Sequence, residues 1–261
     1  HVNWAVGEGG AVLGLMNRDG QPSTAMPMCR EEDLPYFFHQ LEEYFAEVLH
    51  KPFYIALADE EAVQYLGLDP KEYEVEEQVD LKDYLYDGEA MRTLAGKKLH
   101  KKKNHLNAFM REYEGRYEYR RLCCSDRHEV WEFMERWRQK KADADALEDS
   151  LEYEVAGIHE ILKNCSSLSV RMAAVYVDGQ MEAFTIGSLN ERENMAVIHI
   201  EKANPDIKGL YQCMNQQFLV HEFPDVALVN REDDVGMEGL RKAKMSYNPI
   251  GFARKYMVRK R

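Results

Sequence analysis

Two polar stretches follow buried segments of this chain and could do chemistry. Asn230-Arg231-Glu232-Asp233-Asp234 comes directly after the apolar run of residues 226–229. Open α/β sheets bind their ligands outside the carboxyl ends of parallel strands, so these five side chains are candidate binding residues. The competing interpretation is an acidic cluster that caps the following helix.

The second stretch is the loop of residues 202–209, which joins an expected strand to a helix that begins near Leu210. A helix start presents free backbone N–H groups and a partial positive charge, which suit a phosphate or a carboxylate. Lys208 adds a charge there, and Gly209 would let a ligand approach closely. An ordinary strand-to-helix turn explains the same residues equally well.

Most familiar catalytic motifs are absent. The sequence contains neither GxxxxGK nor GxSxG, and residues 7–10 lack the third glycine of a dinucleotide loop. His199-Ile200-Glu201 is similar to the first half of a zinc deaminase signature, but no PCxxC follows it. We therefore expect His199 to be a half-buried strand residue, and we predict no metal site.

The cysteines predict a reducing cytoplasm rather than a disulfide framework. There are five of them, an odd number, and none shows CxxC spacing. No run of about 18 apolar residues is present, so we expect no membrane span.

Charge is distributed unevenly over the 261 residues, whose formal net charge is −12. After Glu238 the chain contains eight lysines and arginines and no acid. A second basic patch consists of Lys97, Lys98, Lys101, Lys102 and Lys103. The acidic field of the whole chain argues against general nucleic-acid binding, although each patch could hold a few phosphates. A solvated surface is the alternative for both patches.

The spacing of apolar residues predicts a mixed α/β (α+β) fold. Period-two stretches and turn residues predict strands within residues 2–28 and at 53–57, 73–79, 117–122, 195–201, 226–229 and 252–258, the last as an edge strand. Asp178-Gly179 predicts a hairpin between residues 170–177 and 181–188. Period-3.6 stretches predict helices at 31–49, 60–66, 89–113, 127–141, 148–163, 210–221 and 236–246. Residues 141–146 are expected to form a polar joint.

The order hairpin, strand, helix, strand, helix occurs twice, near residues 2–66 and near residues 170–246. We therefore predict two domains, at residues 1–88 and 89–261. The numbering opens at His1 rather than at Met, so we expect the first domain to be truncated at its start.

Three segments resemble the C-terminal catalytic domain of phosphatidylglycerol lysyltransferase and its bacterial relatives. They are residues 239–249 with Lys255-Tyr256, residues 230–234 with Gly236 and Gly239, and the basic residues 96–107. The resemblance implies two tandem GNAT-type acyltransferase domains, each a mixed sheet flanked by helices. It also implies transfer of an aminoacyl group from aminoacyl-tRNA, or of an acyl group from acyl-CoA, to an amine or a hydroxyl.

This chain departs from two family patterns. The loop after Glu201 lacks the Q/R-x-x-G-x-G/A cradle of acyl-CoA enzymes. A membrane half is also absent from the sequence, which weakens the case for a lipid acceptor. No tightly bound cofactor is expected, only one of the two donors as a co-substrate.

Under this resemblance the acyl group would lie between the strands of residues 195–201 and 226–230. Glu201 is the first candidate for general base or for binding an acceptor amine, and Asp233 is the second. Tyr247 would protonate the leaving group, unless it only packs in the core. Arg241 and Lys244, three residues apart on one helix, would bind donor phosphates, unless that face is merely solvated.

Candidate donor-binding residues are Lys208, Gly209, Leu210, Asn230, Arg231, Arg241 and Lys244, and Lys97–Lys103 form a candidate tRNA patch. The chain is therefore expected to be a cytoplasmic acyltransferase. The alternative is a non-catalytic protein of the same fold that binds a small anionic or nucleotide-like ligand. The acceptor and the oligomeric state stay open.

Overall fold

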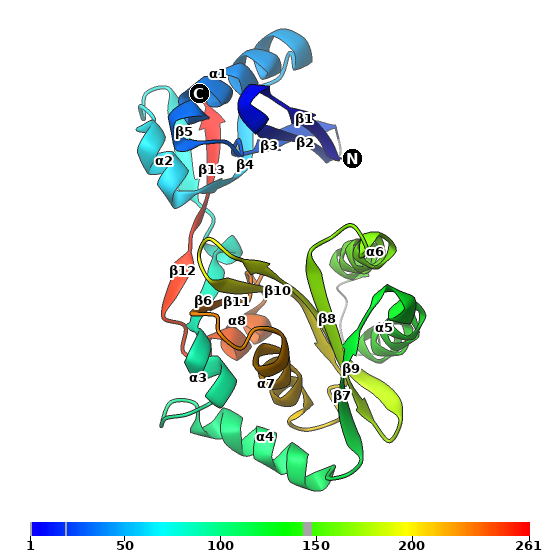
Figure 1. Ribbon diagram of the computed structural model, residues 1–261. Coiled ribbons are helices and arrows are strands. Elements are labelled where there is room, and N and C mark those ends of the chain that lie inside the picture. Colours follow the sequence, from blue (N-terminus) through cyan, green and yellow to red (C-terminus); the bar gives the residue numbers. More distant parts are fainter. Residues whose placement is uncertain (1, 19, 143–147) are drawn as a thin grey trace. The chain divides into compact units, whose positions relative to one another are not determined.

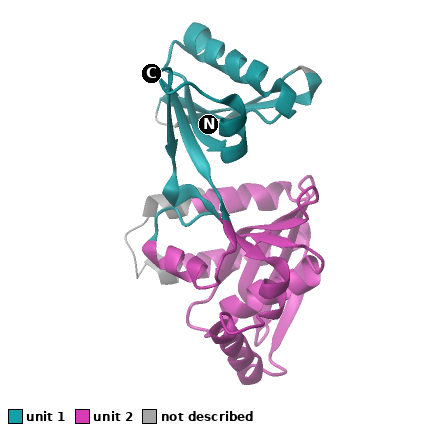
Figure 2. Ribbon diagram, turned by 90° about the vertical axis from the view of Figure 1, so that its left-hand side faces the viewer, with its two compact units in different colours: residues 1–83, 233–237, 252–261 teal, residues 84–232, 238–251 magenta. Residues whose placement is uncertain are grey.

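The computed structural model describes residues 2–18, 20–142 and 148–261, and the chain divides into two compact units (Figure 2). The first unit comprises residues 1–83, 233–237 and 252–261, and the second comprises residues 84–232 and 238–251. Each unit contains its own mixed sheet flanked by helices, which confirms the predicted fold class. These limits differ from a single boundary between residues 88 and 89, because segments from the end of the chain return to the first unit.

The first unit is built on a six-stranded sheet in the order β1-β2-β3-β4-β13-β5. Its strands are β1 (Val2–Val6), β2 (Val12–Arg18), β3 (Gln21–Ala25), β4 (Tyr54–Asp59), β5 (Tyr73–Glu77) and β13 (Lys255–Lys260). β3 and β4 are parallel, whereas the other neighbours are antiparallel.

Apolar faces of two helices close the core of this unit. α1 (Leu34–Glu43) continues as a π-helical turn (Tyr44–Leu49), and α2 (Glu60–Leu66) follows β4. The apolar residues of α1 and its π-helical turn recur every three or four positions. This spacing puts Phe38, Leu41 and Phe45 in one cluster with Ile55 and Val258. The predicted helices at 31–49 and 60–66 are therefore confirmed, with the first α-helix beginning at Leu34.

The second unit contains a seven-stranded sheet in the order β12-β6-β11-β10-β9-β8-β7. Its strands are β6 (Asp83–Asp87), β7 (Tyr117–Leu122), β8 (Val170–Val177), β9 (Gln180–Asn190), β10 (Met195–Ala203), β11 (Leu228–Asn230) and β12 (Gly251–Ala253). The predicted hairpin is formed by β8 and β9, and Asp178 and Gly179 both adopt positive φ in its turn.

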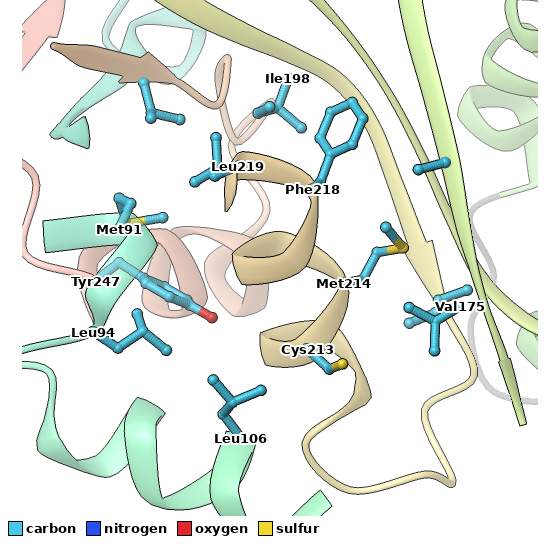
Figure 3. Packing of buried hydrophobic residues seen from close by; sticks show 14 of the residues in the cluster. Met91, Leu94, Leu106, Val175, Ile198, Cys213, Met214, Phe218, Leu219 and Tyr247 are labelled. Carbon is cyan, nitrogen blue, oxygen red and sulfur yellow. The ribbon is translucent and has the colours of Figure 1, made fainter. Parts of the chain in front are cut away.

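Helices cover both faces of this second sheet (Figure 1). One face packs against α3 (Gly88–Thr93), α4 (His100–Glu112) and α7 (Leu210–Glu222), and Figure 3 shows Met214, Phe218 and Leu219 of α7 in this cluster. The other face packs against α5 (Arg127–Ala142) and α6 (Glu148–Asn164). α8 (Glu238–Met245) precedes Tyr247, which joins the first of these clusters.

Two predicted elements were wrong in extent. The expected helix at 89–113 is broken into α3 and α4, because Leu94 and Gly96 adopt left-handed φ values of 47° and 89°. The expected edge strand at 252–258 is two strands. β12 lies at the edge of the second sheet, while β13 lies inside the first sheet between β4 and β5.

The expectation that the cysteines are unpaired was wrong for two of them, because Cys124 and Cys165 are joined by a disulfide bond. Their Cα atoms are 5.9 Å apart, within the range that a disulfide requires. Short periodic patterns do not report which cysteines the fold brings together, since these two are 41 residues apart. The predicted polar joint lies largely outside the described residues, which stop at 142 and resume at 148.

Candidate active site

The carboxyl ends of β10 and β11 form the edge of the second sheet at which the polar side chains gather. The strands are parallel, as predicted, and pair from Met195 opposite Leu228 to Val197 opposite Asn230. β11 ends there, whereas β10 continues to Ala203. The last residues of β10 are thus no longer paired to β11, at the strand ends where α/β sheets bind ligands.

Glu201 lies on this free part of β10 and is held by two donors. Arg231 Nη2 donates to Glu201 Oε1 at 2.8 Å, and Asn215 Nδ2 donates to Glu201 Oε2 at 2.7 Å. The side chains of Glu201 and Arg231 are only 9% and 13% exposed. Because both carboxylate oxygens accept strong hydrogen bonds, Glu201 is arranged to orient Arg231. Its role as general base stays a prediction that these bonds do not support.

Asn215 was not among the residues predicted from the sequence, and its amide oxygen, Oδ1, has no hydrogen-bond donor within the described part of the chain. The residue is 2% exposed on α7, and Oδ1 is buried with no hydrogen-bond partner among the described residues. The orientation of this amide follows from chemistry, because a carboxylate only accepts and the amide nitrogen must face Glu201. A buried acceptor without a donor costs about 1–3 kcal/mol. No motif could have indicated this residue, since it lies within an ordinary amphipathic helix.

Two cations flank the ring of Tyr247. The Arg231 guanidinium carbon is 4.9 Å from the ring centre, and Lys102 Nζ of α4 is 4.2 Å from it. Tyr247 is 7% exposed, and Figure 3 shows its hydroxyl directed toward α7. Acid, cations and phenol from four separate segments therefore meet, and the cations outnumber the acid by one.

The environment of this cluster shifts three pKa values. Burial raises the pKa of Tyr247, against the opposing effect of the Arg231 charge, so the phenol retains its proton. Burial lowers the pKa of Lys102, and the Arg231 charge lowers it further. Burial disfavours the charged form of Arg231, but the Glu201 carboxylate, Tyr247 and Tyr86 together outweigh this effect, and the pKa of Arg231 is raised.

Several predicted donor-binding residues instead hold the loop after β11. Lys244 is 8% exposed, and its Nζ donates to the backbone oxygens of Arg231 at 2.6 Å and Glu232 at 3.2 Å. Asn230 Oδ1 accepts from the backbone N–H of Glu232 at 2.7 Å. The alternative of a solvated face for Lys244 is therefore wrong, because its charge satisfies loop carbonyls, while its binding of donor phosphates stays a prediction.

The remaining predicted residues have other surroundings than those expected for a donor site. Gly209 and Leu210 are buried where α7 begins, and a Cβ on Gly209 would lie 2.3 Å from the His105 oxygen of α4. The close approach predicted for a ligand is thus made by a helix, while Lys208 is exposed and Arg241 is half-buried. Asp233 belongs to the first unit, where its carboxylate accepts from Lys255 Nζ at 3.4 Å.

The lysines of the basic patch lie on and just before α4, and they differ in exposure. Lys97, Lys98, Lys101 and Lys103 are exposed, whereas Lys102 is half-buried and faces Tyr247. α4 thus carries two exposed cations, Lys101 and Lys103, as well as a member of the buried cluster.

Within the described ranges, no three His, Cys, Asp or Glu side chains are arranged to hold a metal ion. Over the same residues, every helix is too short or too polar to cross a bilayer.

The two mixed sheets with their flanking helices define the fold class, which is the tandem GNAT fold. The backbone is similar to that of a tandem GNAT protein from the clavulanic acid biosynthesis pathway, with a TM-score of 0.51 and 9% identity over 100% of this chain and 82% of that one. The family can be stated more narrowly. The sequence profile described as "Phosphatidylglycerol lysyltransferase, C-terminal" matches residues 1–259, and the chain belongs to that family.

Three further proteins are similar to this chain. An uncharacterised protein of Mycoplasmoides gallisepticum is 30% identical over 179 residues, which cover 68% of this chain and 56% of that protein. The match thus spans little more than half the length of this curated relative. A conserved protein of unknown function from Bacteroides thetaiotaomicron has a TM-score of 0.89 at 27% identity over 100% of this chain and 86% of that one. L-PGS from Bacillus licheniformis has a TM-score of 0.72 at 15% identity, covering 99% and 83%.

Proposed function

We propose that this chain is a cytoplasmic acyltransferase that moves an aminoacyl group from aminoacyl-tRNA to an amine or hydroxyl acceptor. The observation that carries the proposal is the cluster of Tyr247, Arg231 and Lys102 beside the unpartnered Asn215 Oδ1. Family membership supports the reaction class. The donor, the acceptor and the compartment belong to the proposal alone.

The proposed chemistry is direct attack of the acceptor on the donor ester. A bond forms between the acceptor atom and the acyl carbon, and the bond from that carbon to the ribose oxygen breaks. Arg231, fixed by Glu201, stabilises the negative charge that develops on the carbonyl oxygen. Tyr247, whose raised pKa keeps its hydroxyl protonated, gives its proton to the leaving oxygen. The lowered pKa of Lys102 increases the fraction of its neutral amine, which accepts the proton that the acceptor loses.

Three features favour aminoacyl-tRNA over acyl-CoA as donor. An aminoacyl ester carries an ammonium group, which could donate to the buried Asn215 Oδ1 and remove the cost of that orphan acceptor. The exposed lysines on and before α4 are also close in sequence to Lys102, which contacts the Tyr247 ring, so a phosphate chain held by them would end near Tyr247. The missing pyrophosphate cradle after Glu201 disfavours acyl-CoA.

Tyr247→Phe tests the reaction. We expect transfer of radioactive amino acids from a charged tRNA pool to acceptors in a bacterial extract to fall about a hundredfold, since general acid catalysis contributes about 10²–10⁴. Affinity for charged tRNA should change little, because phenylalanine keeps the ring in contact with the two cations. Unchanged transfer would refute the role of Tyr247, and tRNA binding without any transfer would favour the non-catalytic alternative.

The donor is tested by the salt dependence of binding. Replacing Lys97, Lys98, Lys101 and Lys103 with Gln should reduce the slope of log affinity against log salt by up to about 3, at roughly 0.7 for each contact to a single-stranded phosphate. The control removes four exposed cations elsewhere in the second unit, namely Arg127, Arg138, Lys163 and Arg192. Equal slopes for the two variants, or tighter binding of CoA than of tRNA, would exclude this donor assignment.

A further inference from the structure

Ser188, His199 and Glu232 form a second hydrogen-bonded chain in the second unit. Ser188 Oγ lies 2.8 Å from His199 Nε2, and His199 Nδ1 lies 2.7 Å from Glu232 Oε1. The three residues come from β9, from β10 and from the loop after β11. A hydroxyl, an imidazole and a carboxylate in this order are the arrangement that activates a serine nucleophile.

The direction of the protons in this chain follows from the chemistry of its members. An ionised carboxylate can only accept, so His199 Nδ1 must carry the proton that is donated to Glu232. In the neutral imidazole, Nε2 is then the acceptor, and the Ser188 hydroxyl donates to it. This is the protonation state in which histidine can remove the serine proton.

Local backbone geometry fixes two of the three members, His199 and Glu232. His199 is the additional residue where the register between β9 and β10 shifts, between Ile198 and Ile200. Glu232 has a positive φ of 55°, which is costly for a residue with a side chain. Its N–H is bound by Asn230 Oδ1 and its backbone oxygen by Lys244 Nζ, so surrounding contacts hold it in this conformation.

This chain of residues lies on the opposite sheet face from Tyr247. Phe184 and Ile186 of β9 belong to the cluster under α5 and α6, and Ser188 shares their face by strand alternation. Glu201, by contrast, bonds to Asn215 of α7 on the other face. His199 and Glu232 are 31% and 41% exposed, and Ser188 is half-buried, so a small reagent could reach them.

We propose that Ser188 is the nucleophile of a second reactive site, which cleaves small carboxylic esters with His199 as base and Glu232 as positioning residue. Ser188 Oγ bonds to the acyl carbon while its proton passes to His199 Nε2. The bond from the acyl carbon to the alcohol oxygen then breaks, and the alcohol leaves with that proton. Water then gives a proton to Nε2 and its hydroxyl to the acyl carbon. The bond from the acyl carbon to Ser188 Oγ breaks, and Oγ takes the proton back from Nε2, which releases the acid and restores Ser188.

Covalent labelling tests the nucleophile. Diisopropyl fluorophosphate should modify the tryptic peptide of residues 172–192, in which Ser188 is the single serine. Ser188→Ala should abolish this modification, and His199→Gln should slow it at least about a hundredfold, the usual contribution of a general base. Ser125→Ala, which removes an exposed serine remote in sequence, is the matched control and should label at the wild-type rate.

Hydrolysis of p-nitrophenyl acetate should follow the same order of variants. An unmodified peptide 172–192, or equal labelling rates for wild type and His199→Gln in proteins with wild-type circular dichroism, would overturn the proposal. This result would leave the Tyr247 reaction standing, because no residue is shared between the two sets of proposed catalytic groups.

The positioning role of Glu232 has its own measurement. A long-range ¹H–¹⁵N spectrum should show His199 protonated on Nδ1 in the wild type. Glu232→Gln should lose that tautomer preference and slow labelling, while Glu232→Asp should retain part of both. A wild-type spectrum with the proton on Nε2 would contradict the proposed activation of Ser188.

Discussion

At the scale of single residues, Arg231 links the groups of the candidate active site. Its side chain is paired with Glu201, its charge faces the Tyr247 ring, and its backbone oxygen is bound by Lys244. A nearly buried cation of this kind is stable only while its partner carboxylate is present, because desolvation alone would disfavour its charge.

Glu201→Gln should therefore destabilise the protein as well as impair transfer. Removing one partner of a buried pair leaves an uncompensated charge, and we expect the free energy of unfolding to fall by about 3 kcal/mol. Chemical denaturation at neutral pH measures this loss. Glu135→Gln, which removes a partly exposed partner of Arg138 on α5, is the control and should cost less than about 1 kcal/mol. Equal losses would show that the Glu201 pair is not effectively buried.

Cys213 provides a prediction about how stability depends on pH. The thiol is buried on α7, and burial raises its pKa to about 12. The folded state thus holds this proton to higher pH than the unfolded state, so the stabilisation is complete below about pH 8.5 and is lost as pH rises toward 12. The free energy of unfolding should fall more steeply above pH 9 in wild type than in Cys213→Ala, by up to about 1.4 kcal/mol per pH unit.

The exposed Cys123 serves as the control for that measurement. Cys123→Ala should leave the alkaline slope as it is in the wild type. Iodoacetamide at pH 8 should alkylate Cys123 and spare Cys213 in the folded protein. Parallel curves for wild type and Cys213→Ala would mean that the thiol is not protected by burial.

At the scale of elements, the junction of α4 with α7 determines which residues reach the cluster. The break after α3 lets α4 begin at His100, and this places Lys102 against Tyr247. Gly209 permits the close packing, because it has a φ of 82° and its α-carbon faces the His105 oxygen.

Gly209→Ala should consequently destabilise the second unit by more than the cost of placing an alanine at positive φ. A positive φ alone costs an alanine about 1–2 kcal/mol, and the clash with α4 should add about 1–3 kcal/mol. Gly115→Ala is the matched control, since Gly115 has a φ of 70° and open space around its α-carbon. Thermal unfolding of both variants provides the comparison, and equal shifts in Tm would show that α4 does not constrain Gly209.

At the scale of the whole molecule, the chain returns to its first sheet after completing the second unit. β13 pairs with β4 on one side and with β5 on the other, and its Val258 is fully buried. The first unit therefore depends on residues at the far end of the sequence.

Removing residues 255–261 should unfold or loosen the first unit selectively. β4 and β5 would lose their shared neighbour, so their amides should exchange with solvent faster. Amides of β9 and β10 should keep their protection, since these strands pair with each other rather than with β13. Hydrogen exchange read by mass spectrometry tests this, with removal of Arg261 alone as the control. Unchanged protection in β4 would contradict the interior position of β13.

The sequence by itself determined most of the helices and strands, because the spacing of apolar residues records which side of each element is buried. The Asp178-Gly179 hairpin and the parallel strands before Glu201 and Asn230 were predictable for the same local reason. Glu201, Arg231 and Tyr247 were all selected as candidates, and the structure places Arg231 between the other two.

The tertiary structure alone decided the partners of those residues. Both carboxylate oxygens of Glu201 accept hydrogen bonds, and Lys102 contacts the Tyr247 ring. Lys244 donates to a loop carbonyl, and Asp233 belongs to the first unit. The tertiary structure also joined Cys124 to Cys165, brought Asn215 to the cluster and aligned Ser188 with His199. Such contacts join segments far apart in the chain, and a periodic pattern encodes the face that a residue occupies but not the side chain it will meet there.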